Sequence, residues 1–93
     1  MKSKNEIDSE GNDHWTVYII ESQAGKLYTG ITTDLARRFE QHASGRNGAR
    51  FFKTSPPSRI VYSESAVDRS AASRRESAIK RMTRKQKLDL IGG

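Results

Sequence analysis

The two segments on either side of Gln23-Ala24-Gly25 constrain the fold of this 93-residue chain more than any other feature. Each segment has the composition of a β-strand and carries a tyrosine, Tyr18 in the first and Tyr28 in the second. Because strand side chains alternate between faces, the loop length decides whether both rings share a face of the sheet. A two-residue loop separates them, whereas a three-residue loop places them together. We expect the three-residue loop, because its third position usually requires a positive φ, which suits Gly25.

In this register Tyr18 lies opposite Gly30, and a set of apolar side chains gathers on the other face of the hairpin. The set comprises Trp15, Val17, Ile19, Leu27 and Ile31. We expect this apolar face to pack in the core, which leaves the paired tyrosines on the opposite face.

The remaining sequence predicts one more strand and three helices. The first helix has Thr32 or Thr33 as its expected cap, and the second has Asp68 or Ser70. Residues 45–58 are rich in Gly, Pro and Ser and predict a loop. The expected strands cover about 15–22, 26–32 and 59–64, and the expected helices about 34–43, 68–82 and 84–91. The fold class is therefore α/β (α+β), a small three-stranded antiparallel sheet flanked by helices in the order β-β-α-β-α-α.

Composition limits the size and the setting of this fold. Residues 1–14 are almost all polar, charged or Gly and predict a disordered tail, which leaves residues 15–93 as one domain with room for one modest core but not two. The absence of cysteine excludes disulfides and thiolate metal sites. The sequence has no apolar run long enough for a membrane span and no secretory signal, so we expect a cytoplasmic protein.

Charge is the second global feature. Lysine and arginine outnumber the acids by 17 to 11, which gives a formal net charge of +6. Many of these cations lie between Arg69 and Lys87, where Glu76 is the only acid. This balance favours a polyanionic partner, most simply nucleic acid, although a solvated basic helix face would have the same composition.

Several blocks of the sequence match one family in the expected order. Thr16-Val17-Tyr18 and Tyr28-Thr29-Gly30 stand at the positions of two family signatures, residues 34–42 stand at the following helix, and residues 74–80 at a later one. With these blocks the chain resembles the GIY-YIG nuclease superfamily over roughly residues 15–90. It is most similar to small stand-alone bacterial proteins that resemble the nuclease domain of the excision-repair subunit UvrC.

The resemblance implies a metal-dependent nuclease that hydrolyses phosphodiester bonds in DNA, in repair or processing, with RNA not excluded. Its implied cofactor is Mg²⁺ or another divalent metal such as Mn²⁺, and a protein partner is a candidate source of specificity. The implied catalytic residues are Tyr18, Tyr28, Arg38 and His42, with Glu76 as the metal ligand and Gly30 keeping bulk away from the phosphate. The expected nucleic-acid contacts are Arg74, Lys80, Arg81, Arg84 and Lys85.

The chemistry of these side chains supports such roles. Arg38 and His42 lie one helical turn apart, and the planar fork of an arginine clamps phosphate well. Tyr28 is the implied general base, and because a free phenol has a pKa of about 10 it needs nearby positive charge to act near neutrality. Tyr18 is expected to hydrogen-bond to Tyr28 or to the attacking water.

Structural alternatives remain open for the same residues. Both tyrosines suit an ordinary half-buried sheet, Glu76 suits a surface pair with Lys80, and His42 suits the end of a helix dipole. Thr16 replaces the glycine of the first signature, and no asparagine follows Glu76, where many relatives have one. The competing functions are a non-catalytic nucleic-acid-binding module that keeps the fold and, third, an adaptor for an acidic protein.

Overall fold

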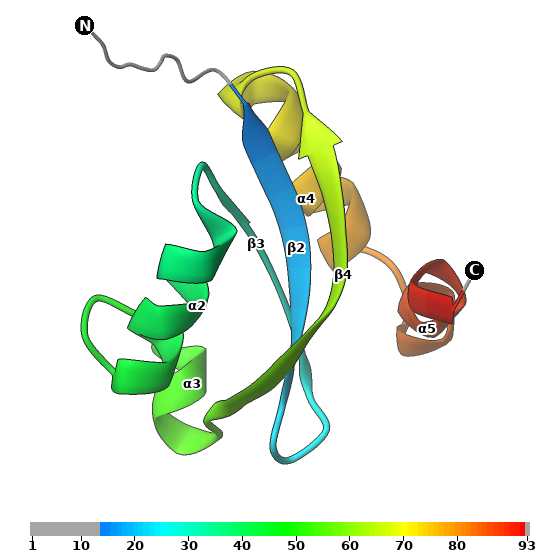
Figure 1. Cartoon of the computed structure of the whole chain (residues 1–93). Helices are drawn as coiled ribbons and strands as arrows, with labels where there is room; N and C mark the ends of the chain where they lie inside the picture. The colour runs from blue at the N-terminus through cyan, green and yellow to red at the C-terminus, as the bar shows by residue number, and fades with distance from the viewer. Residues whose placement is uncertain (1–13, 93) are drawn as a thin grey trace, which may run out of the picture.

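A computed structural model describes residues 14–92 of the chain (Figure 1). Its elements are β2 (Trp15–Ser22), β3 (Leu27–Thr32), α2 (Leu35–Ser44), α3 (Phe51–Thr54), β4 (Pro57–Ala66), α4 (Arg69–Lys80) and α5 (Arg84–Gly92). The three strands form one antiparallel sheet in the order β3-β2-β4. The expected element order is confirmed, with α3 as an added helical turn inside the expected loop. The expected disordered tail lies outside the described residues except for His14.

The hairpin closes as the three-residue loop requires. Tyr18 pairs with Gly30, and Ile20 pairs with Tyr28. The Ser22 N–H donates to the Lys26 carbonyl at 2.8 Å, and Gly25 has a φ of 82°. The expected register is therefore confirmed, and both tyrosines share a face of the sheet.

Helices cover both faces of the sheet, with α2 and α3 on one side and α4 on the other (Figure 1). The buried side chains divide accordingly into two clusters, because all four residues of the run 17–20 in β2 are buried and alternate between the faces. The α4 face holds Val17, Ile19, Ala72 and Ile79, and the α2 face holds Tyr18, Ile20 and Phe52. The structure therefore has a small buried cluster on each face of the sheet, and the expectation of a single core is wrong.

The N-terminus of α2 is capped differently from the expectation. The Asp34 carboxylate accepts a hydrogen bond from the Arg37 N–H at 3.1 Å, so Asp34 is the cap and Thr32 and Thr33 are not. Thr32 supports the cap instead, because its hydroxyl accepts from the Asp34 N–H at 3.1 Å. At the other end Gly45 has a φ of 80° and closes the helix in the left-handed conformation.

The two later helices begin at well-formed caps. The Asp68 carboxylate accepts from the Ala71 N–H at 2.8 Å, which confirms Asp68 as the cap of α4. Thr83 and Gln86 exchange hydrogen bonds between side chain and backbone at the start of α5, a capping box. Of the helices within residues 14–92, none has the length and apolar character to cross a membrane.

A partly exposed ion pair links α4 to the sheet. The Arg75 Nε donates to both carboxylate oxygens of Glu64 on β4, at 3.1 and 3.0 Å. The Tyr62 hydroxyl donates to the same carboxylate. This contact joins α4, which also carries Glu76, to the edge strand of the sheet.

Candidate active site

A buried hydrogen bond joins Tyr18 to His42 at the centre of the α2 face. The Tyr18 oxygen lies 3.0 Å from His42 Nε2, and the two residues are 1% and 2% exposed. His42 Nδ1 accepts from the Ala49 N–H at 3.0 Å. Since Nδ1 is an acceptor, the proton of the neutral ring is assigned to Nε2, which donates to the Tyr18 oxygen. The Tyr18 O–H is therefore left to donate to another group.

Burial sets the charge state of this pair. It lowers the pKa of His42 to about 4, with a further contribution from the positive charge of Arg38. Burial also raises the pKa of Tyr18 to about 12, against the opposing effect of the Arg38 guanidinium. Both groups are therefore neutral near pH 7, and His42 brings no positive charge to the last turn of α2.

Tyr28 lies against this pair through its ring. Its centroid is 5.5 Å from that of His42 in an edge-on arrangement and 6.4 Å from that of Tyr18. The structure thus brings together three of the residues expected in the site. The Tyr18 oxygen accepts a hydrogen bond from His42, however, and makes none with Tyr28, which one of the sequence-based expectations had as its partner.

Gly30 makes room for the Tyr18 phenol. A Cβ atom added at this position would lie 2.6 Å from Tyr18 Cζ and closer still to the hydroxyl oxygen. From the family resemblance, this glycine is expected to keep side-chain bulk away from the phosphate. In the structure that space is filled by the Tyr18 ring, which gives the glycine a different physical reason.

The short helix α3 closes the cluster from the side. The Phe52 side chain is 4% exposed, and its ring lies 4.6 Å from that of His42 and 5.0 Å from that of Tyr28. Phe51 is half-buried with its ring 5.4 Å from Tyr28. The pair anchors its segment against the site, and burial of Phe52 accounts for the helical turn where the sequence predicts loop.

Ala49 is a neighbour of the cluster to which the sequence assigns no role at the site. It acts through its backbone N–H on His42, so its side chain carries no signal of the role. The preceding Gly48 lies directly on α2, since a Cβ there would be 2.6 Å from the Gln41 carbonyl oxygen. Gly48 is therefore a signal in the sequence, because glycine is favoured where two backbone segments pack closely together.

Arg38 lies at the edge of the cluster, half-exposed on α2. Its Nη1 donates to the Asn47 carbonyl at 2.7 Å and to the Gln41 side-chain oxygen at 2.9 Å. These bonds hold the guanidinium in place, and its charge contributes to the pKa shifts of both Tyr18 and His42. The guanidinium also faces Tyr18, since a side-chain hydrogen bond from Arg38 opposes the rise in the pKa of Tyr18.

Glu76 belongs to α4, on the other side of the sheet, and is not in contact with the aromatic cluster. Its side chain is 22% exposed, and Lys80 Nζ lies 3.1 Å from its Oε2, as the surface-pair alternative expects. Its negative charge still reaches the site, because it is one of the weaker causes of the raised pKa of Tyr18. The structure therefore links Glu76 to the cluster through charge alone.

The expected nucleic-acid contacts all lie exposed on α4, on α5 or between them. Arg84 has an additional structural role, since its Nη2 donates to the Gly25 carbonyl at 3.0 Å and ties α5 to the hairpin loop. Lys85 pairs weakly with Asp89 at 3.8 Å. The five cations, Arg74, Lys80, Arg81, Arg84 and Lys85, are thus spread along two helices and the turn between them.

Comparisons with known proteins agree with this architecture. The GIY-YIG catalytic domain matches residues 14–89. The UPF0213 protein DP2720 of Desulfotalea psychrophila is 47% identical over 77 residues, which are 83% of this chain and 70% of that protein. The UPF0213 protein YhbQ of Escherichia coli is 43% identical over 77 residues, 83% of this chain and 76% of its own.

One solved structure is also similar. It is the solution NMR structure of the UPF0213 protein BH0048 from Bacillus halodurans, with 37% sequence identity and a TM-score of 0.55. The alignment covers 85% of this chain and 83% of that one. Since the family match, the sequence similarity and the fold agree, the chain belongs to the GIY-YIG catalytic domain family, in which it is similar to the UPF0213 proteins.

Proposed function

We propose that this protein is a nuclease that hydrolyses phosphodiester bonds in DNA with a divalent metal ion, most simply Mg²⁺. The observation that carries the proposal is the buried Tyr18–His42 hydrogen bond, beside the Tyr28 ring, in a chain of the GIY-YIG family. A buried polar pair is less favourable than apolar packing unless it is fully satisfied. Its presence in so small a core is explained by a chemical role.

Tyr18 and Tyr28 take different parts in the proposed reaction. With its raised pKa, Tyr18 keeps its proton near pH 7 and acts as a hydrogen-bond donor, not as a base. Because its oxygen already accepts from His42, its O–H can orient the attacking water or a phosphate oxygen. Tyr28, half-buried at the edge of the cluster, is then the general base that takes a proton from the water.

Arg38 supplies positive charge to the phosphate. Asn47 and Gln41 hold its Nη1, and the rest of the guanidinium is directed to the Tyr18 side of the cluster, where a phosphate oxygen would bind. A guanidinium held in this way is preorganised and so stabilises the charge that develops during hydrolysis. His42 positions Tyr18 and stays neutral while doing so.

Glu76 is the residue that would hold the metal. Within residues 14–92 no three His, Asp, Glu or Cys side chains are grouped for metal binding. A single carboxylate fits Mg²⁺, which keeps several waters and binds through one or two carboxylates and the substrate phosphates. When bound, the ion would supply positive charge that activates water and neutralises the phosphate. Without it, the Lys80 ammonium neutralises the Glu76 carboxylate.

The test is cleavage of a labelled duplex and a labelled single strand of DNA, with Mg²⁺ and with EDTA. The variants are Tyr28→Phe and Glu76→Ala, with Glu40→Ala as a matched control because Glu40 is exposed on α2, away from the cluster. We expect each of the first two changes to lower the cleavage rate roughly 100-fold or more, and the control to cleave like the wild type. Cleavage in EDTA, or full activity in both variants, would overturn the proposal.

A non-catalytic DNA-binding module is the second candidate function. The exposed cations on α4 and α5 favour it, because phosphate contacts of this kind require no catalytic group. Salt-sensitive DNA binding without cleavage in any divalent metal would support this alternative. The role in repair or processing, RNA as a substrate, a partner that supplies specificity and the cytoplasmic location stay predictions.

A further inference from the structure

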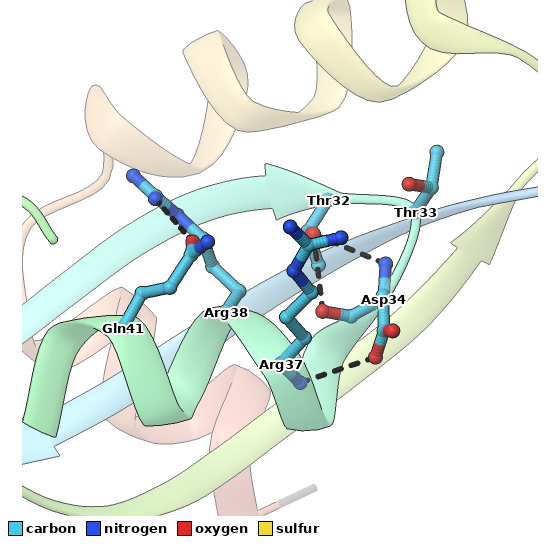
Figure 2. Close-up of a pocket in the computed structure, with 6 residues that line it drawn as sticks. All are labelled: Thr32, Thr33, Asp34, Arg37, Arg38 and Gln41. Atoms are coloured by element: carbon cyan, nitrogen blue, oxygen red, sulfur yellow. Dashed lines mark hydrogen bonds between the residues drawn. The ribbon is translucent and has the colours of Figure 1, made fainter. Parts of the chain in front are cut away.

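A pocket of about 190 Å³ opens at the N-terminal end of α2, beside the candidate active site. It is lined by Thr32, Thr33, Asp34, Arg37, Arg38 and Gln41 (Figure 2). A water molecule takes up about 30 Å³ in the liquid, so the pocket has room for a phosphate group with several waters. Its lining is polar and includes two arginines, which excludes an apolar ligand as its natural occupant.

Arg37 contributes positive charge that no described residue neutralises. Its guanidinium makes no hydrogen bond or ion pair with any side chain or carbonyl of residues 14–92, although its backbone N–H is held by the Asp34 cap. Figure 2 shows the guanidinium groups of Arg37 and Arg38 on the same side of α2. The one carboxylate of the lining, Asp34, is engaged at the helix terminus, so the net charge favours an anion.

Arg38 connects the pocket to the candidate active site. It lines the pocket, and its charge also acts on Tyr18 and His42 inside the aromatic cluster. Two phosphates of one nucleic-acid strand can therefore lie on either side of this guanidinium. One would be the phosphate under attack at the tyrosines, and the other its neighbour along the strand.

We propose that the pocket between Thr32 and Gln41 binds a DNA backbone phosphate next to the scissile one, with Arg37 as its principal ligand. The inference rests on the proposed function and assigns part of its substrate contact. Arg37 acts here in binding and positioning, while Arg38 faces both phosphates. Contact with a phosphate carries no base sequence information, so this subsite sets the placement of the strand without selecting its sequence.

The experiment measures DNA binding in EDTA, where cleavage does not interfere. The probe is a short fluorescent duplex of mixed sequence, titrated at several salt concentrations with the wild type, Arg37→Gln, Arg37→Lys and Arg46→Gln. Arg46 is the matched control, because it is an exposed arginine outside the pocket that follows the same helix. Since both positions are exposed, we expect all variants to fold, and urea unfolding checks this.

We expect Arg37→Gln to weaken binding roughly three- to tenfold at low salt. It should also reduce the salt slope, which is the steepness with which the logarithm of the association constant falls against the logarithm of the salt concentration, by about one. Arg37→Lys should keep most of the wild-type salt slope. Arg46→Gln should change the DNA affinity and the salt slope less than Arg37→Gln does. Amide NMR signals of Thr32, Thr33 and Asp34 should shift on addition of DNA. Equal binding by Arg37→Gln and Arg46→Gln, or unchanged amide signals at saturating DNA, would overturn the inference.

Cleavage with Mg²⁺, measured separately, distinguishes this inference from the proposed function. If the wild type cleaves DNA and Arg37→Gln binds like the control, the pocket assignment fails and the nuclease stands. If Arg37→Gln loses binding selectively and the wild type cleaves nothing, the phosphate pocket stands and the nuclease fails.

Discussion

The two faces of the sheet bury side chains of different chemistry. The buried cluster of the α4 face consists of Val17, Ile19, Ala72 and Ile79, all aliphatic. The α2 face buries the Tyr18 hydroxyl and the His42 imidazole, each with a hydrogen-bond partner. Aliphatic packing stabilises a fold without directional partners, whereas buried polar groups require them. The comparison indicates that the aliphatic cluster of the α4 face chiefly stabilises the domain, and it supports the proposal that the two tyrosines of the α2 face act on the substrate while Glu76 of α4 holds the metal.

Truncating the α4 face should have the largest effect on stability. Ile79 is fully buried under the sheet, so Ile79→Ala removes apolar contacts and leaves a cavity. We expect a loss of about 2–5 kcal/mol in the free energy of unfolding, measured by urea denaturation. The exposed Val67→Ala is the matched control and should change stability little. A loss of similar size in both variants would contradict the role given to this face.

The buried His42 of the α2 face should make the free energy of unfolding depend on pH in the acid range. The folded protein holds the pKa of His42 near 4, against 6.5 in the unfolded chain, so it binds fewer protons between these values. Stability that is present above pH 6.5 is therefore lost as the pH falls towards 4, by up to about 3 kcal/mol. Unfolding curves across this range should show the loss in the wild type and in the exposed control His14→Gln. If His42→Gln keeps the same pH dependence, the assignment to His42 is wrong.

Gly30→Ala tests how tightly the polar cluster is packed. The added methyl would collide with the Tyr18 ring, so we expect a loss of about 1–3 kcal/mol in unfolding free energy. Gly92→Ala, which meets no neighbour within 4 Å, is the control. Combining Gly30→Ala with Tyr18→Phe should cost less than the sum of the single changes, because the hydroxyl is the closest obstacle. Strict additivity in this cycle would contradict the proposed packing.

Thr29→Val, on the α4 face, should have the smallest effect on stability of the changes considered. The Thr29 hydroxyl is the one buried side-chain polar atom within residues 14–92 that lacks a hydrogen-bond partner. Replacing it with a methyl removes this unfavourable group, so we expect stability to rise by up to about 1 kcal/mol. Urea denaturation measures the change, and the cleavage rate should not fall. A destabilised Thr29→Val would indicate a partner for this hydroxyl.

The parts of the fold that depend on local sequence could be predicted. The hairpin register followed from the alternation of its strands and the positive φ available to Gly25, and the cap of α4 followed from Asp68. The two-sided sheet could have been found in the same way. The continuous apolar run 17–20 is typical of a strand that is buried on both faces.

Tertiary contacts decided what the sequence could not show. The helical turn α3 forms where Phe52 packs on His42, a contact between distant segments. The bond from the Ala49 N–H to His42 involves no side chain of Ala49 and so left no pattern to find. The sequence favoured Thr32 or Thr33 as the cap of α2, whereas in the structure the Asp34 carboxylate lies over the Arg37 N–H and is the cap. Within the site, residue types were predictable and their hydrogen-bond partners were not.

The most direct test is the rate of Mg²⁺-dependent DNA cleavage by Tyr18→Phe compared with Tyr62→Phe. The two changes remove the same atom, one on the α2 face and one on the α4 face. If the chemistry belongs to the α2 face, folded Tyr18→Phe should cleave roughly 100-fold more slowly than the wild type, and Tyr62→Phe should cleave at nearly the wild-type rate. A folded Tyr18→Phe that cleaves as fast as Tyr62→Phe would contradict this account.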